Sequence, residues 1–145
     1  MTLLAHPAPR GCDHLDDAAL VARFEALAVA PADFRHREHV RLAFAMLRGA
    51  DFGEAALRFR GALRRFADAA GVPGRYHETL TWAYLALIAQ RAAEDPAAAT
   101  SFELVARHPD LVDHTTGAVA RYYDVAAVTA SPLARAVFVL PLRRA

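Results

Sequence analysis

The sequence contains no lysine and only one cysteine, and both scarcities limit what the chain can do. Cys12 has no partner for an internal disulfide, so we expect a reducing compartment, the cytoplasm. Arginines supply all 17 positive charges against 16 acidic residues, and the net charge of +1 creates no general attraction to nucleic acid or to an anionic membrane. We attribute the arginine bias to a GC-rich coding sequence rather than to an arginine-based anion site.

Glycine-rich phosphate loops and long hydrophobic runs are also missing. The seven glycines are scattered, and none has GxGxxG or GxxxxGK spacing, so no nucleotide cofactor is expected. The longest apolar stretch, residues 80–89, is about half the length that a membrane span requires. The arginines within residues 58–65 are interpreted as a solvated helix face. Neither a nucleic acid nor a membrane is therefore expected as a partner.

The residues that are present indicate a globular, helical protein. Of the 145 residues 55% are hydrophobic and 23% charged, a composition that suits one compact domain. We predict a flexible arm over residues 1–12 and a single helical domain over residues 13–145. The predicted fold class is all-α, a bundle of four longer helices followed by short C-terminal helices.

Periodicity and capping residues define the expected helices. The ranges of the four longer helices are 13–28, 36–48, 52–70 and 76–93. Asp51 is expected to cap the third helix and Gly71 to end it. Thr100 or Ser101, and later the Ser131-Pro132 pair, should begin short helices. The run 137–140 is the only candidate strand, and one strand cannot form a sheet.

The segment "FRHREHVRLAFAML" places two histidines on one helix face. His36 and His39 are three residues apart, which brings their Cβ atoms to about 5–6 Å. The same face continues with apolar residues, whereas Glu38 and Arg41 are expected to point outward. Two inward imidazoles provide half of a transition-metal site, because neutral imidazole binds zinc and iron and is less costly to bury than a carboxylate.

The segment "YHETLTWAYLALIAQ", residues 76–90, begins the most apolar helix with two ionisable groups. Because residues 80–89 are almost entirely apolar, we expect this helix to be covered on most sides, so that polar groups in its first turn need partners. His77 would complete a metal site with His36 and His39. Glu78 would act as a fourth ligand or as a general base.

Each of these residues also has a purely structural interpretation. His77 can serve as a helix cap, Glu78 is common in a first helical turn, and the neighbouring threonines can bond back to their own helix. His39 can be a core histidine that donates to a carbonyl group. His114 lies in a predicted loop, and the sequence leaves its role open.

Three segments, "FRHREHVRLAFAMLR", "RFRGALRRFADAAGVPGRYHETLTWAYLALI" and "RYYDVAAVTASPLARAVFVLP", resemble a small bacterial family of stand-alone helical proteins. The shared motifs of that family are H-x-x-H and Y-H-E-T-x-T, and the resemblance covers roughly residues 20 to 142. It implies no particular reaction. The motif positions that it implies here are His36, His39, Tyr76, His77, Glu78, Thr79 and Thr81, with Tyr123 and Arg135 in the C-terminal motif.

The resulting hypothesis is a metal-dependent enzyme that acts on a small molecule. His36, His39 and His77 would hold a divalent zinc or iron ion between the second and fourth helices, with Glu78 as the catalytic group. The residues assigned to the substrate pocket are Tyr76, Thr79, Thr81, Trp82, Tyr84, Tyr123 and Arg135.

Several alternatives stay open at the level of sequence. The same polar cluster suits a non-catalytic module that binds a small ligand or a partner, and the apolar helix faces allow a homodimer. Arg135 is interpreted first as the partner of a buried acid such as Glu78 or Asp124. Its second interpretation is a clamp for a substrate carboxylate.

Overall fold

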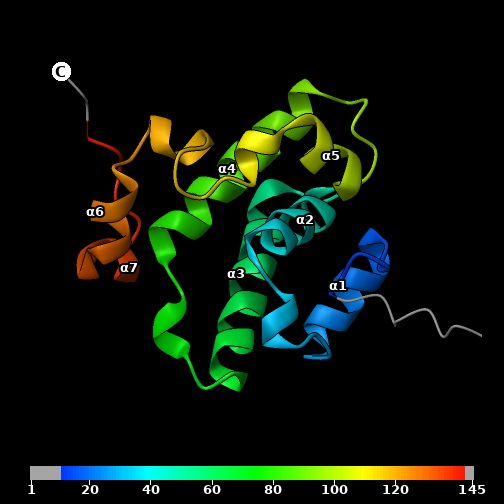
Figure 1. Cartoon of the computed structure of the whole chain (residues 1–145), viewed down its shortest axis with the longest axis horizontal. Coiled ribbons are helices and arrows are strands. Elements are labelled where there is room, and N and C mark those ends of the chain that lie inside the picture. Colours follow the sequence, from blue (N-terminus) through cyan, green and yellow to red (C-terminus); the bar gives the residue numbers. More distant parts are fainter. Residues whose placement is uncertain (1–10, 143–145) are drawn as a thin grey trace, which may run out of the picture.

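A computed structural model describes residues 11–142 and shows an all-α protein in this range (Figure 1). The helices are α1 (Asp17–Glu25), α2 (His36–Leu47), α3 (Phe52–Ala69), α4 (Glu78–Glu94), α5 (Ser101–Arg107), α6 (Val125–Ala130) and α7 (Pro132–Ala136). Short 3-10 turns lie at Pro31–Asp33, Pro73–Arg75, Pro109–Leu111 and Ala118–Arg121. No strand occurs between residues 11 and 142, which confirms the predicted fold class. Most of the predicted arm lies outside the described residues.

The first helix is shorter than the sequence predicted. It begins at Asp17 because the side chain of Asp16 accepts a hydrogen bond from the backbone N–H of Ala19 at 2.8 Å. The chain before it forms a turn, in which the side chain of Cys12 is only 2% exposed. Cys12 therefore belongs to the hydrophobic core, and its assignment to a flexible arm was wrong.

Four other helix boundaries follow local chemistry as predicted. Asp51 caps α3 by accepting from the N–H of Glu54, and Gly71 follows α3 with a φ of 74°. Thr100 caps α5 and Ser131 caps α7, each through its hydroxyl oxygen. The observed caps confirm these boundaries. The sequence could predict them because each depends on residues within one turn of the helix end.

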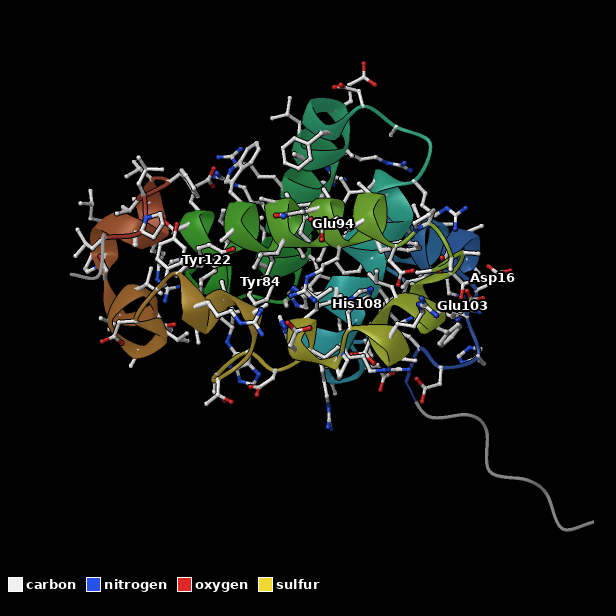
Figure 2. All side chains as sticks on the ribbon, turned by 90° about the horizontal axis from the view of Figure 1, so that it is seen from above. Asp16, Tyr84, Glu94, Glu103, His108 and Tyr122 are labelled. Carbon is white, nitrogen blue, oxygen red and sulfur yellow. The ribbon has the colours of Figure 1, made fainter. Side chains whose placement is uncertain are left out.

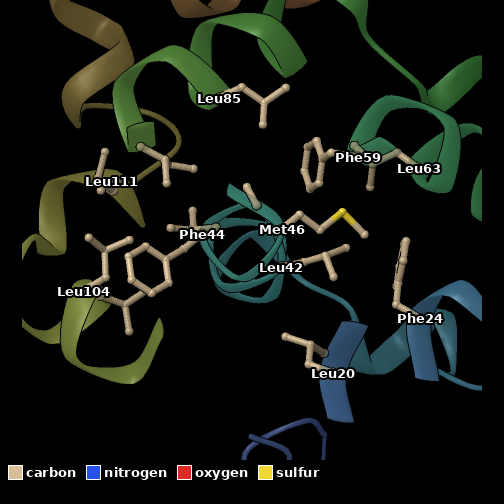
Figure 3. Close-up of a cluster of buried hydrophobic side chains, with 14 of the residues drawn as sticks. Leu20, Phe24, Leu42, Phe44, Met46, Phe59, Leu63, Leu85, Leu104 and Leu111 are labelled. Atoms are coloured by element: carbon tan, nitrogen blue, oxygen red, sulfur yellow. The ribbon is translucent and has the colours of Figure 1, made fainter. Parts of the chain in front are cut away.

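Helix α2 forms the centre of the molecule. It packs against α1, α3, α4 and α5, and Figure 3 shows it surrounded by side chains from these helices. The core residues labelled there include Leu20, Phe24, Leu42, Phe44, Met46, Phe59, Leu85 and Leu104. Helix α4, which the sequence predicted to be covered on most sides, leaves Ala86 and Gln90 exposed, whereas α2 has no exposed residue.

The enclosure of α2 also overturns the predicted outward orientation of two charged residues. Arg41 is 0% exposed, and Glu38 is buried with its carboxylate accepting from the backbone N–H of Arg35 at 3.0 Å. The guanidinium of Arg41 donates to the carbonyl oxygens of Cys12 and Leu15 at 3.0 and 2.6 Å. With helices on every side, α2 has no solvent face for Arg41, and the turn before α1 supplies acceptors instead.

The C-terminal helices α6 and α7 lie at the opposite end of the molecule from α1 (Figure 1). The chain after α7 is fastened to α4 by Thr79, whose hydroxyl donates to the carbonyl oxygen of Val137 at 2.8 Å and accepts from the N–H of Val139 at 3.0 Å. The run 137–140 is thus an anchored coil segment. Within residues 11–142, no helix combines the length and the apolar character needed to cross a bilayer.

Candidate functional site

A cavity of about 560 Å³ lies between α2, α3 and α4, with parts of α6 and of the turn before α4 closing one side. Its volume falls within the range of small-molecule pockets. Most of its wall is apolar. The larger apolar side chains on the wall include Phe34, Val40, Phe59, Leu63, Leu80 and Ile88.

Six residues predicted from the sequence as site residues meet at this cavity. They are His36, His39, Tyr76, His77, Thr81 and Tyr84. Helix α4 presents residues 77, 80, 81, 84 and 88 to the cavity, a spacing that lies along one helix face. Figure 2 shows Tyr84 projecting from α4. Residues of both sequence motifs, H-x-x-H and Y-H-E-T-x-T, therefore line the same cavity.

His36 is held by a contact with a distant segment. Its Nε2–H donates to the carbonyl oxygen of Leu111 at 2.9 Å, and its ring lies edge-on to Tyr84 with the centroids 4.7 Å apart. Burial lowers the pKa of His36, so the neutral imidazole is favoured. Because Nε2 carries the proton, the remaining acceptor of this ring is Nδ1.

His39 lies deeper beside the Phe34 ring, with the ring centroids 4.3 Å apart. Burial, together with the neighbouring His36, lowers the pKa of His39 to about 3, and no hydrogen bond to a described residue opposes this effect. The side chain is partly exposed, but it opens into the cavity. His39 thus provides a neutral imidazole whose ring nitrogens can form hydrogen bonds with a ligand.

Both ring nitrogens of His77 are already used by the fold. Nδ1 accepts from the backbone N–H of Leu80 at 3.2 Å and caps α4, while Nε2–H donates to the carbonyl oxygen of Val128 at 2.8 Å. Burial lowers the pKa of His77, in keeping with the neutral ring that this pair of bonds requires. The interpretation of His77 as a helix cap is confirmed. As a metal ligand, His77 would have to give up one of these bonds.

Two tyrosine hydroxyls at the site have no hydrogen-bond partner in the described part of the chain. The hydroxyl oxygens of Tyr76 and Tyr84 are both buried. Burial raises the pKa of each phenol to about 12, and the carboxylates of Glu78 at Tyr76 and of Asp113 at Tyr84 add to the rise. The Tyr76 hydroxyl therefore faces Glu78, although its geometry does not reach that of a hydrogen bond. A buried hydroxyl without a partner costs about 1–3 kcal/mol, so these groups mark an incompletely satisfied region.

Glu78 does not belong to the cavity wall. Its carboxylate accepts from Nε of Arg60 at 2.9 Å and from the indole N–H of Trp82 at 2.7 Å. Burial raises the pKa of Glu78, but these hydrogen bonds outweigh burial and hold the pKa below its ordinary value. The carboxylate therefore joins α3 to α4, away from the position predicted for a catalytic base, and Trp82 is engaged there rather than at the cavity.

The other predicted pocket residues fasten the C-terminal segment. Thr79 bonds Val137 and Val139, and the hydroxyl of Tyr123 donates to the carbonyl oxygen of Val139 at 2.8 Å. Neither Thr79 nor Tyr123 lines the cavity.

Arg135 bonds to backbone carbonyls rather than to an acid. Its guanidinium donates to the carbonyl oxygens of Gly74 at 2.7 Å and Thr129 at 3.1 Å. The predicted pairing with Glu78 or Asp124 was wrong. The structure brings Arg135 to the turn before α4 because α7 packs against α4.

Sequence reasoning missed three polar residues on the cavity wall. His114 lies beside His36, with the ring centroids 5.5 Å apart, and Arg35 and Arg75 line the cavity while remaining exposed to solvent. Arg35 directly precedes the H-x-x-H motif and Arg75 directly precedes the Y-H-E-T-x-T motif. Their adjacency to the motifs was the available signal.

The described residues contain no preformed metal centre. Between residues 11 and 142, no group of three or more His, Cys, Asp or Glu side chains is arranged to hold a metal ion. His36 and His77 direct their Nε2 atoms to two different carbonyl groups, 2.9 and 2.8 Å away. A zinc or iron site on these histidines stays a prediction that requires rearranged rings.

Comparisons of the chain with protein-family models, with curated proteins and with solved structures found no match.

Proposed function

We propose that this protein binds a small, largely apolar molecule in the cavity between α2, α3 and α4. The observation that carries this proposal is the cavity itself, about 560 Å³ in volume, where the two motifs converge. Pockets of this size, with apolar walls and a few placed polar groups, are typical of small-molecule sites.

The polar groups of the site support binding more than acid–base catalysis. No aspartate, glutamate or cysteine lines the cavity. A pKa of about 3 makes His39 a weak base at neutral pH, although its neutral ring remains a hydrogen-bonding group. The metal-dependent enzyme gains less support, since Glu78 is bound to Arg60 and Trp82.

The test uses a neutral fluorescent probe, N-phenylnaphthylamine, whose emission rises when it enters an apolar site. We expect the protein to bind it with one-to-one stoichiometry. Ala67 lies on the cavity wall, so the larger side chain in Ala67→Phe should fill the cavity and weaken binding by at least about tenfold. The matched control is Ala22→Phe, which alters an exposed position on α1.

Circular dichroism melts establish that each variant is folded. Should Ala67→Phe fail to fold, Ala70→Phe tests the same cavity from the end of α3. Absence of probe binding to the unmodified protein would refute the proposal. So would equal affinities of the folded cavity variants and the control.

A further inference from the structure

Within residues 11–142, two arginines at the mouth of the cavity form no salt bridge with an acidic side chain. Arg35 is the residue before α2 and Arg75 ends the turn before α4, so they approach the cavity from different elements. Both are exposed to solvent. Neither forms a salt bridge with another residue of the described range, whereas seven other arginines do.

The carboxylates of Glu38, Glu78 and Asp113 lie nearby, and within residues 11–142 none of them forms a salt bridge with Arg35 or Arg75. Glu38 accepts a hydrogen bond from the backbone N–H of Arg35 at 3.0 Å. Glu78 is bound by Arg60 and Trp82. Asp113, the acid that faces Tyr84 and His36, accepts hydrogen bonds from Thr115 and Thr116, including one of 2.6 Å from the Thr116 hydroxyl. The hydroxyl donors leave the negative charge of Asp113 in place, but neither Asp113 nor Glu78 pairs with Arg35 or Arg75 in the described range.

Further guanidinium groups surround Tyr76, which lies on the same side of the cavity. Those of Arg60 and Arg64 lie 5.9 and 5.5 Å from the centre of the Tyr76 ring. Arg135 donates to the carbonyl oxygens of Gly74 and Tyr76. Of these arginines, Arg60 alone is paired with an acid in the described part of the chain. Cavities with apolar walls concentrate such a field, so this side should attract anions.

We propose that the ligand is an apolar molecule with a single acidic group, which it places between Arg35 and Arg75. The apolar part would occupy the wall formed by Phe59, Leu63 and Ile88. A planar guanidinium binds a carboxylate through two parallel hydrogen bonds, which suits recognition at the edge of an apolar cavity. This inference rests on the proposed function, because it assigns a chemical class to the same ligand.

The same arginines bear on the interpretation of the lysine-free composition. The sequence alone favoured a coding bias over an anion site. The fold brings Arg35 and Arg75, which are 40 positions apart in the chain, to the wall of one cavity.

The experiment measures displacement of bound N-phenylnaphthylamine by octanoate and by octanol, which differ in the acidic group. We expect Arg75→Gln and Arg35→Gln each to raise the octanoate concentration needed for half-displacement by about tenfold, the effect of losing one charge-assisted hydrogen bond. Octanol displacement, referred to each variant's own affinity for the probe, should shift less than octanoate displacement. Added salt should weaken the displacement of the probe by octanoate but not by octanol, because salt screens the charge of the carboxylate.

Arg23→Gln is the matched control, since it removes an exposed charge on α1 that does not line the cavity. It should leave octanoate displacement as in the unmodified protein. If the probe binds and the Arg35 and Arg75 variants behave like this control, the anionic ligand class is overturned while the binding cavity stands. If the probe does not bind the unmodified protein, both the function and the ligand class are refuted.

Discussion

His77 and Val128 connect the start of α4 to α6, with the imidazole Nε2 2.8 Å from the carbonyl oxygen. The other nitrogen caps α4 through the N–H of Leu80. A residue that the sequence suggested as a metal ligand thus uses its whole hydrogen-bonding capacity within the fold. Removal of the His77 side chain should therefore lower the free energy of unfolding.

We expect His77→Ala to lower the free energy of unfolding by about 2 kcal/mol, because it removes a helix cap and leaves the Val128 carbonyl without its donor. His77→Asn restores a capping side chain and should recover about half of that loss. Urea denaturation measures the stability of both variants.

Metal analysis of protein purified without a histidine tag tests the alternative role of His77 as a metal ligand. Stoichiometric zinc or iron that is lost in the His36, His39 and His77 alanine variants alike would instead establish the metal centre.

Arg41→Ala should destabilise the protein by about 3 kcal/mol or more, because it leaves buried acceptors without a donor. The acceptors are the carbonyl oxygens of Cys12 and Leu15 and the hydroxyl of Ser101. Arg48→Ala, at the exposed end of α2, is the matched control and should cost less than about 1 kcal/mol. Equal losses in the two variants, measured by urea denaturation, would contradict the buried role of Arg41.

Stability should fall as the pH is lowered below about 6.5, the ordinary pKa of histidine. The folded protein holds the pKa of His39 near 3, so the unfolded chain binds the proton first. The stabilising contribution is complete above the unfolded pKa and is lost on acidification, at up to about 1.4 kcal/mol per pH unit. The lowered pKa values of His36 and His77 act in the same direction.

The variant His39→Leu should make this dependence shallower between about pH 6.5 and pH 5, above the range in which carboxylates titrate. Phe34→Leu alters the ring that stacks on His39 without removing a titrating group, and it should lower stability while keeping the slope. Unfolding free energies measured across this pH range give the slope for each variant. An unchanged slope in His39→Leu would show that His39 titrates normally in the folded protein.

Tyr84→Phe should leave the stability of the ligand-free protein unchanged or raise it by up to about 1 kcal/mol, because the lost hydroxyl is buried and unpaired in the described range. Tyr123→Phe is the contrasting control. The Tyr123 hydroxyl donates to Val139 at 2.8 Å, so its loss should destabilise the protein by about 1 kcal/mol. Thermal and urea denaturation compare the two. A loss in Tyr84→Phe as large as in Tyr123→Phe would show that the Tyr84 hydroxyl has a partner.

Local rules were sufficient for the helices and for part of the site. Asp51, Gly71 and Ser131 set helix boundaries through residues within one turn. Spacing along a helix likewise placed His36 and His39 on one cavity. Both features depend on near neighbours in the chain, which the sequence displays directly.

The tertiary structure alone decided which polar groups are occupied. His36 bonds the carbonyl of Leu111, 75 positions away, and His77 bonds that of Val128, 51 positions away. No periodicity identifies a distant carbonyl. Arg41 likewise looked solvent-facing from its helix position, but α2 has neighbours on every side. The sequence by itself determined where helices form and which residues share a face, because those depend on local geometry. Packing determined which faces are covered and which nitrogen atoms remain free for a ligand.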